Sequence, residues 1–195
     1  MASKKEVVTT PEFRAAFVNL FKPSAGLAGG KPKYRLVMLF DAAAQKTAEF
    51  GEMRRIAKAA AEDKWGADKT KWPKGLDTPF KNGDEKPEYM GYPGNVYASA
   101  ARDAEKMGKP GVVDAARNII TDEAAVYSGC YMRARVLAYA YTYAGKNGVR
   151  FGLQHVQKIR DGEAFAGGGR PEEAFDATYD GEAVAATPVA DSDGF

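Results

Sequence analysis

The stretch YMRARVLAYAYTYA, residues 131–144, carries the fold prediction. Successive side chains of a β-strand point to opposite faces of its sheet. One alternate set here is small and mostly apolar: Met132, Ala134, Val136, Ala138, Ala140 and Thr142. The other set interleaves arginines with tyrosines: Tyr131, Arg133, Arg135, Leu137, Tyr139, Tyr141 and Tyr143. Small apolar side chains suit the crowded interior of a small closed barrel, so the stretch predicts one long barrel strand.

The arginine and tyrosine face also suggests a function. Binding of single-stranded nucleic acid needs cations for the phosphates and flat rings for the bases, and stacking contributes roughly 1–3 kcal/mol per base. A competing interpretation is packing alone, because tyrosine is common in strands at any sheet surface. The basic charge of the rest of the chain favours the binding interpretation.

Further strands are predicted on both sides of this stretch. Runs of apolar and aromatic residues predict strands at 12–21, 34–40, 96–101, 111–120 and 149–159. The segment Gly145-Lys146-Asn147-Gly148 is predicted as a hairpin turn, because Asn-Gly is the usual hairpin dipeptide. The sequence therefore predicts a mainly β domain.

One helix interrupts the predicted strands. Apolar residues at Phe50, Met53 and Ala57 recur at helical spacing, with Asp41 as the predicted cap and Gly66 as the predicted end. A glycine- and lysine-rich loop is predicted over 22–33, and a long irregular segment over 66–95. A long loop in a compact domain is often functional.

Charge divides the chain into a basic body and an acidic tail. Residues 1–160 carry 27 Lys and Arg against 17 Asp and Glu, a net charge of +10. Residues 161–195 carry one Arg against nine Asp and Glu, a net charge of −8. A basic body is typical of proteins that bind polyanions. An acidic tail can compete for the basic surface or recruit partners. The tail ends at Asp191-Ser192-Asp193-Gly194-Phe195, which gives it one hydrophobic anchor.

These patterns predict three parts: a short mobile lead at 1–11, a binding domain at 12–165 and a disordered tail at 166–195. The tail is rich in Gly, Ala, Glu and Asp, and has few apolar residues to bury.

Several classes of protein are disfavoured. Cys130 and His155 are the sole residues of their types, so a Cys/His zinc site cannot be built and no metal or cofactor is expected. A single cysteine suits a reducing cytosol. No run of about 18 apolar residues predicts a membrane span. Ala25 and Pro32 break the phosphate-loop pattern around Lys31, and no nucleophile elbow surrounds Ser128. No enzyme is predicted.

Four stretches together resemble a family of phage single-stranded-DNA-binding proteins with an OB fold. They are GGKPKYRLVMLF (29–40), PGVVDA (110–115), YSGCYMRARV (127–136) and GLQHVQKIRDGEAF (152–165), and the resemblance spans roughly 12–165. The acidic tail with its terminal aromatic is also similar in kind to the tails of such proteins.

The resemblance implies a five-stranded barrel with an inserted helix and an extended loop. It implies non-catalytic protection of single-stranded DNA (ssDNA) during phage replication and recombination, in the cytoplasm of the bacterial host. Its implied contacts fall on Tyr131, Arg133, Tyr139 and Tyr141, with residues 31–35 nearby.

Adding the other basic and aromatic positions gives the complete predicted site. The predicted ssDNA-binding residues are Lys31, Lys33, Tyr34, Arg35, Tyr97, Tyr131, Arg133, Arg135, Tyr139, Tyr141, Lys158 and Arg160. Asp191, Asp193 and Phe195 are the predicted partner-binding residues of the tail, and replication or recombination proteins are the expected partners.

Two other functions stay open from the sequence. A protein-interaction adaptor would use the same tyrosine face as an interface, since Tyr and Arg are common hot-spot residues. An RNA-binding OB protein would look the same, because discrimination can rest on one 2′-hydroxyl contact. The oligomeric state is also open.

Overall fold

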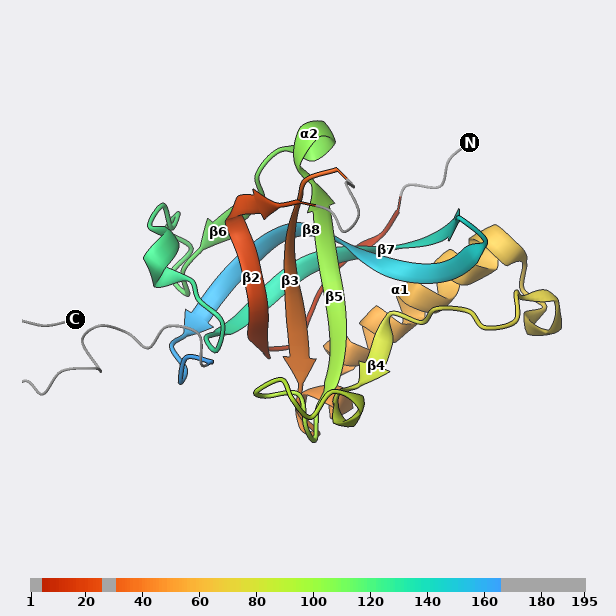
Figure 1. The fold of residues 1–195 in the computed structure, drawn as a ribbon, viewed down its shortest axis with the longest axis horizontal. Coiled ribbons are helices and arrows are strands. Elements are labelled where there is room, and N and C mark those ends of the chain that lie inside the picture. The colour runs from red at the N-terminus through yellow and green to blue at the C-terminus, as the bar shows by residue number, and fades with distance from the viewer. Residues whose placement is uncertain (1–4, 26–30, 166–195) are drawn as a thin grey trace, which may run out of the picture.

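The computed structural model describes residues 5–25 and 31–165, which Figure 1 traces in colour. Its strands are β1 (Val7–Thr9), β2 (Phe13–Ser24), β3 (Lys33–Phe40), β4 (Phe80–Asn82), β5 (Val96–Asp103), β6 (Gly111–Val113), β7 (Tyr131–Tyr143) and β8 (Lys146–Arg160). Its α-helices are α1 (Ala48–Trp65) and α2 (Ala104–Met107), and its short 3-10 helices are η2 (Ala44–Lys46), η3 (Lys69–Lys71), η4 (Gly83–Glu85) and η5 (Glu123–Ala125).

Among the described residues, five strands close into a ring. β2 pairs with β3, β3 pairs with β5, β8 pairs with β7 and β7 pairs with β2, all antiparallel, whereas β5 pairs with β8 in parallel. In Figure 1, β2, β3 and β5 stand side by side while β7 and β8 cross behind them. The predicted five-stranded OB barrel with an inserted helix is confirmed.

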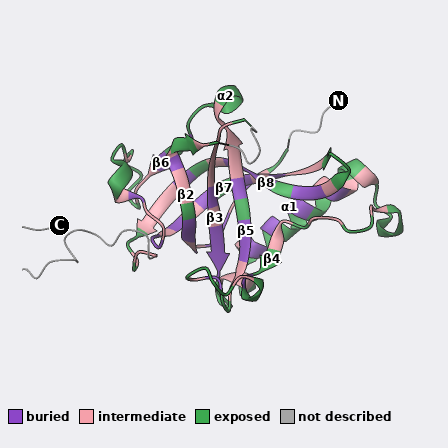
Figure 2. Ribbon diagram, viewed as in Figure 1, coloured by how far each residue is buried: buried purple, intermediate pink, exposed green. Residues whose placement is uncertain are grey.

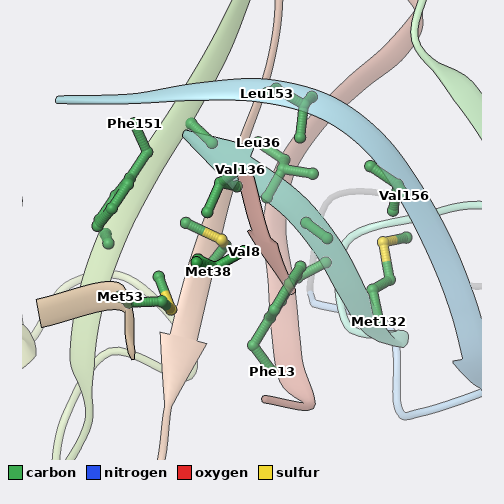
Figure 3. Packing of buried hydrophobic residues seen from close by; sticks show 14 of the residues in the cluster. Val8, Phe13, Leu36, Met38, Met53, Met132, Val136, Phe151, Leu153 and Val156 are labelled. Carbon is green, nitrogen blue, oxygen red and sulfur yellow. The ribbon is translucent and has the colours of Figure 1, made fainter. Parts of the chain in front are cut away.

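The predicted inner face of β7 lines the core. Met132, Ala134 and Val136 are almost fully buried, and they share the barrel interior with side chains such as Phe13 and Leu153 (Figure 3). Figure 2 shows that burial is concentrated on the barrel strands, whereas the loops are largely exposed. The alternation read from the sequence therefore describes this strand correctly.

Helix α1 closes one side of the core, but its start differs from the prediction. The backbone N–H of Phe50 donates to the Thr47 hydroxyl over 3.3 Å, so Thr47 is the N-cap. The Asp41 carboxylate instead accepts from Ala44 N–H over 2.7 Å. The predicted cap at Asp41 was wrong, because η2 lies between it and α1. The helix ends before Gly66, as predicted, where φ is +86°.

The turn of the β7–β8 hairpin also differs from the prediction. Tyr143 pairs with Lys146, so the turn is Ala144-Gly145, whose φ angles of +47° and +75° suit a type I′ turn. The predicted turn at 145–148 was wrong, because Gly148 is needed inside the strand. A Cβ on Gly148 would lie 2.7 Å from the Tyr141 hydroxyl.

The long irregular segment docks on this hairpin. The N–H of Asp77 donates to the Asn147 carbonyl, and the N–H of Val149 donates to the Asp77 carbonyl, each over 2.9 Å. Helix α1 packs against β7 and β8 as well. The hairpin beyond the barrel is thus held by both α1 and this loop.

Other boundaries differ in smaller ways. The predicted lead contains β1, because Val7 and Val8 can pair with Leu137 and Val136 of β7. The strand predicted at 111–120 is only Gly111–Val113, because a turn follows at Asp114. The tail, 166–195, lies outside the described residues.

Candidate nucleic-acid interface

A row of outward-facing positions crosses four strands of the barrel. Arg35 of β3 pairs with Ala101 of β5, Ala101 pairs with Gly152 of β8, and Gly152 pairs with Leu137 of β7. A Cβ on Gly152 would lie 3.0 Å from the Leu137 side chain, so a glycine here leaves room for that side chain and adds no side chain of its own to the outer face. Ser99, two positions before Ala101, is exposed on the same side of β5. We call Ser99, Ala101 and Gly152 the small-residue floor.

The hairpin forms one wall beside this floor. Ala138 and Ala140 pack in the cluster that contains α1, so alternation turns Tyr139 and Tyr141 to the other side of β7. The Arg150 guanidinium lies 4.6 Å from the Tyr141 ring centroid. Cations next to stacking rings are what a single strand of nucleic acid needs.

The same cation arrangement recurs at Tyr139. The ammonium of Lys5, on the segment before β1, lies 5.3 Å from the Tyr139 ring centroid. Burial raises the pKa of Tyr139, with Arg150 opposing the shift, so the phenol stays neutral at physiological pH. Both hairpin tyrosines therefore present neutral rings beside positive charges.

Asp77 fixes the Tyr141 end of this wall. The Tyr141 hydroxyl donates to Asp77 Oδ2 over 2.8 Å, and Lys81 Nζ donates to Asp77 Oδ1 over 2.5 Å. Arg150 lies 3.7 Å from the same carboxylate. Partial burial alone would raise the pKa of Asp77, but the hydrogen bonds from Lys81 and Tyr141 outweigh it and lower that pKa. Asp77 is therefore ionised at neutral pH.

An aromatic cluster lies at the other end of the floor. The ring centroids of Phe17 and Tyr89 are 5.3 Å apart, those of Tyr89 and Tyr92 are 5.4 Å apart, and those of Tyr92 and Tyr97 are 4.9 Å apart. Lys86 Nζ lies 5.5 Å from the Tyr89 centroid and 5.6 Å from that of Tyr97. We call Phe17, Tyr89, Tyr92 and Tyr97 the aromatic cluster.

The members of the aromatic cluster differ in exposure. Phe17 is 49% exposed and Tyr89 is 39% exposed, whereas Tyr97 is 7% exposed and supports the others from β5. Burial and the neighbouring tyrosines raise the pKa of Tyr92 to about 12. Tyr97 was predicted from the sequence. Tyr89 and Tyr92 were visible only as members of a long loop, and nothing in the sequence singled out Phe17.

Arg35 stands at the edge of the floor. One of its terminal nitrogens donates to the Ala25 carbonyl over 3.2 Å, and its Nε is buried with no hydrogen-bond partner. Lys31 is exposed and lies 2.8 Å from the Glu105 carboxylate. Lys33 begins β3, and alternation turns Tyr34 away from Arg35. The structure therefore brings Arg35, and not Tyr34, to the outer face.

The first residues of β7 lie far from the hairpin tyrosines. Tyr131 and Tyr139 are eight positions apart, or about 26 Å along an extended strand. The Tyr131 ring lies between Arg160, 3.4 Å from its centroid, and Arg14, at 5.9 Å. Arg160 in turn lies 2.7 Å from the Glu12 carboxylate. These residues form a separate group at the other end of the strand.

The remaining predicted cations mostly have protein partners. Arg133 Nε donates to the Thr10 carbonyl over 3.3 Å, and its guanidinium lies 3.9 Å from Glu49. Lys158, with a side chain only 15% exposed, donates to the Ala125 carbonyl over 2.7 Å and lies 2.7 Å from Asp161. Arg135 is exposed beside His155. The structure thus gathers Arg35, Tyr97, Tyr139 and Tyr141 on one face. Lys33 and Arg135 lie on the same side of their strands, two positions before Arg35 and Leu137, whereas Tyr34, Tyr131, Lys158 and Arg160 lie elsewhere.

Residues 5–25 and 31–165 contain no group of three or more His, Cys, Asp and Glu that could hold a metal ion. Within the same residues, no helix has both the length and the apolar character that crossing a bilayer requires.

A closed OB barrel whose outer face carries rings paired with cations is an arrangement typical of proteins that bind single-stranded nucleic acid. Residues 5–185 match the family described as the ssDNA-binding protein of Enterobacter phage Enc34. The chain belongs to this family of phage ssDNA-binding proteins.

One relative and two solved structures are also similar to this chain, and the two structures agree with its fold. The chain is 37% identical over 163 residues to putative protein p50 of Acyrthosiphon pisum secondary endosymbiont phage 1, covering 80% of this chain and 84% of that protein. The bacteriophage Enc34 ssDNA-binding protein in complex with ssDNA matches with a TM-score of 0.65 at 21% identity, over 81% of this chain and 88% of that one. The bacteriophage T7 ssDNA-binding protein gp2.5 matches with a TM-score of 0.61 at 18% identity, over 93% and 100%.

Proposed function

We propose that this chain binds ssDNA without sequence preference across the outer face that runs from the β7–β8 hairpin, over the small-residue floor, to the aromatic cluster. The observation that carries the proposal is the pairing of rings with cations at both ends of this face, Tyr141 with Arg150 and Tyr89 with Lys86. The name of the Enc34 protein supports ssDNA as the ligand.

The mechanism follows from the residue types. Arg35, Lys86 and Arg150 attract the phosphates, and Tyr89 and Tyr139 present rings to the bases. Stacking accepts every base, because every base has a π-face. Release of counterions makes binding weaken with salt, with a log–log slope of about −0.7 for each phosphate neutralised on a single strand.

The wider role is coating and protecting single strands during phage replication and recombination, in the cytoplasm of the host and without catalysis. Within this proposal, residues 12–165 are the binding domain and 166–195 an appended acidic tail. Asp191, Asp193 and Phe195 would recruit replication or recombination proteins once DNA displaces the tail. The family assignment supports the role, and the charge division of the sequence supports the tail.

The test is fluorescence anisotropy with a labelled oligo-dT of about 30 nucleotides, a length that exceeds the site of one OB fold. The same length of duplex and an oligo-U are measured alongside, each at two salt concentrations. We expect strong preference for the single strand over duplex and loss of affinity as salt rises. Equal affinity for oligo-U would favour the RNA interpretation. Absence of binding to all three would contradict the proposal and favour a protein interface.

A further inference from the structure

The β2 strand contains a bulge with an unusual residue. Ala16 pairs with Val37 and Asn19 pairs with Arg35, so β2 has one residue more than β3 between these two pairs. Phe17, inside the bulge, has a φ of +49°. A bulge position in the left-handed region is usually glycine, and a bulky side chain there is a genuine outlier. The backbone is strained at this position.

Surrounding contacts hold the strained conformation. The Asn19 side-chain amide donates to the Phe17 carbonyl over 3.1 Å, and the Val18 N–H approaches the Ser128 hydroxyl at 3.5 Å. Such strain persists only where neighbouring structure fixes it, and it concentrates at functional sites. Neighbouring groups therefore hold the bulge in a strained conformation of the kind found at functional sites.

The Phe17 ring does little for the core. Neither buried cluster of the described residues includes it, and half of its surface faces solvent. Its ring makes edge-type contacts with the rings of Tyr89, at 5.3 Å between centroids, and Tyr92, at 6.3 Å. A glycine would relax the backbone at this position, so stability does not explain a phenylalanine.

We propose that Phe17 is a further stacking residue, beside Tyr89 and Tyr139, that increases the preference of this face for single-stranded over double-stranded DNA, an inference that rests on the proposed function. An unpaired base can turn its π-face to the exposed ring. The bases of a duplex are stacked on one another and covered on both faces. The cations of the face attract the phosphates of either form, so they contribute affinity but little preference. Stacking on the Phe17 ring contributes binding free energy that only a single strand can gain.

Three variants separate the ring from the strain. Phe17→Gly removes the ring and relieves the strain. Phe17→Leu removes the ring but keeps an apolar side chain on the strained backbone. Ala144→Gly is the matched control, because Ala144 also has a positive φ, of +47°, and carries no ring. Affinities for an oligo-dT and for a duplex of the same length are measured at one salt concentration, and melting temperatures confirm folding.

We expect both Phe17 variants to lose about 5- to 150-fold in affinity for oligo-dT, the range of one stacked base. Their affinity for duplex changes less than about 2-fold, since the cations remain. Phe17→Gly melts no lower than the unaltered chain, and Ala144→Gly leaves both affinities unchanged. An equal loss on both DNA forms, or an unchanged ratio, would overturn the inference. An unaltered chain without preference would instead contradict the proposed function.

Discussion

Arg150 and Arg55 offer a comparison of two similar side chains in different places. Arg150 lies over the Tyr141 ring with its side chain 58% exposed, whereas Arg55 lies on α1 with 47% exposure and contacts Glu6 and Glu52. We expect Arg150→Ala to weaken ssDNA binding several-fold and to reduce the log–log salt slope by about 0.7. Salt titrations by anisotropy give both quantities.

Arg55→Ala is the control, because it removes the same charge away from the proposed face. Exposed ion pairs contribute little to stability, so this variant stays folded. Its salt slope should match that of the unaltered chain. If the two variants reduce the slope equally, net charge rather than the Arg150 position controls binding.

At this scale the sequence predicted some residues and could not predict others. Tyr139 and Tyr141 follow from the period of two along a strand, which needs no tertiary information. The position of Phe17 depends on a bulge that is stabilised by tertiary contacts, and no local sequence pattern predicts that bulge. Asp41 and Thr47 are both good cap residues, so only the structure could show which of them begins α1.

Among the elements, the hairpin depends on its contact with the 66–80 loop. Asp77→Asn keeps the backbone pairing but loses the charged hydrogen bond from Lys81, so we expect about 1 kcal/mol less stability at pH 7. Denaturant unfolding measures this loss, and proteolytic cleavage within 66–80 should become faster.

We also expect the stability difference between the unaltered chain and Asp77→Asn to depend on pH. The pKa of Asp77 is lower in the folded chain than its usual value of 3.8, so its stabilising effect is complete above that value. The effect is lost as pH falls through the folded pKa, because protonation removes the charge. The stability difference between the unaltered chain and Asp77→Asn should therefore be constant from pH 7 to 5 and shrink below about pH 3.8. A difference that grows in acid would contradict this assignment.

Element boundaries show where local signals compete with packing. Asn147-Gly148 is a strong turn signal, yet the turn forms at Ala144-Gly145. Gly148 instead lies in the strand, where the absence of a side chain lets Asp77 approach closely. Because Asp77 lies 71 positions earlier in the chain, the hairpin sequence alone could not reveal that use. The long β7 and β8 strands were predictable because their apolar alternation is sustained.

For the whole molecule, the charge division predicts competition between tail and DNA. Residues 166–195 carry seven Asp and Glu against one Arg. We expect deletion of 166–195 to strengthen ssDNA binding at low salt and to matter little at high salt, where screening weakens the competition. Anisotropy with the truncated and full chains gives the comparison. Weaker binding after deletion would show that the competition idea is wrong.

The five-stranded topology came mainly from the resemblance, because strand periodicity gives strands but not their order. The parallel pairing of β5 with β8 joins segments about 50 residues apart, which no local pattern encodes. The resemblance implied a five-stranded barrel but no strand order, so this pairing is known from the structure alone. The face that combines the hairpin, the floor and the aromatic cluster became visible only once the strands were placed.

The closing strand of the barrel has a consequence for how the chain is made. β8 pairs with β5, β6 and β7, and β2 meets β7 across more than 100 residues, so the ring cannot form until almost all of the domain has been synthesised. Domains with contacts this distant in sequence fold slowly, and a ribosome adds only about 5–20 residues per second. Through that interval β2, β3 and β5 can pair with one another, but β2 lacks β7 and β5 lacks β8, so the apolar face of this sheet stays uncovered. Expression should therefore respond to chaperones and to growth temperature more strongly than the stability of the finished barrel would indicate.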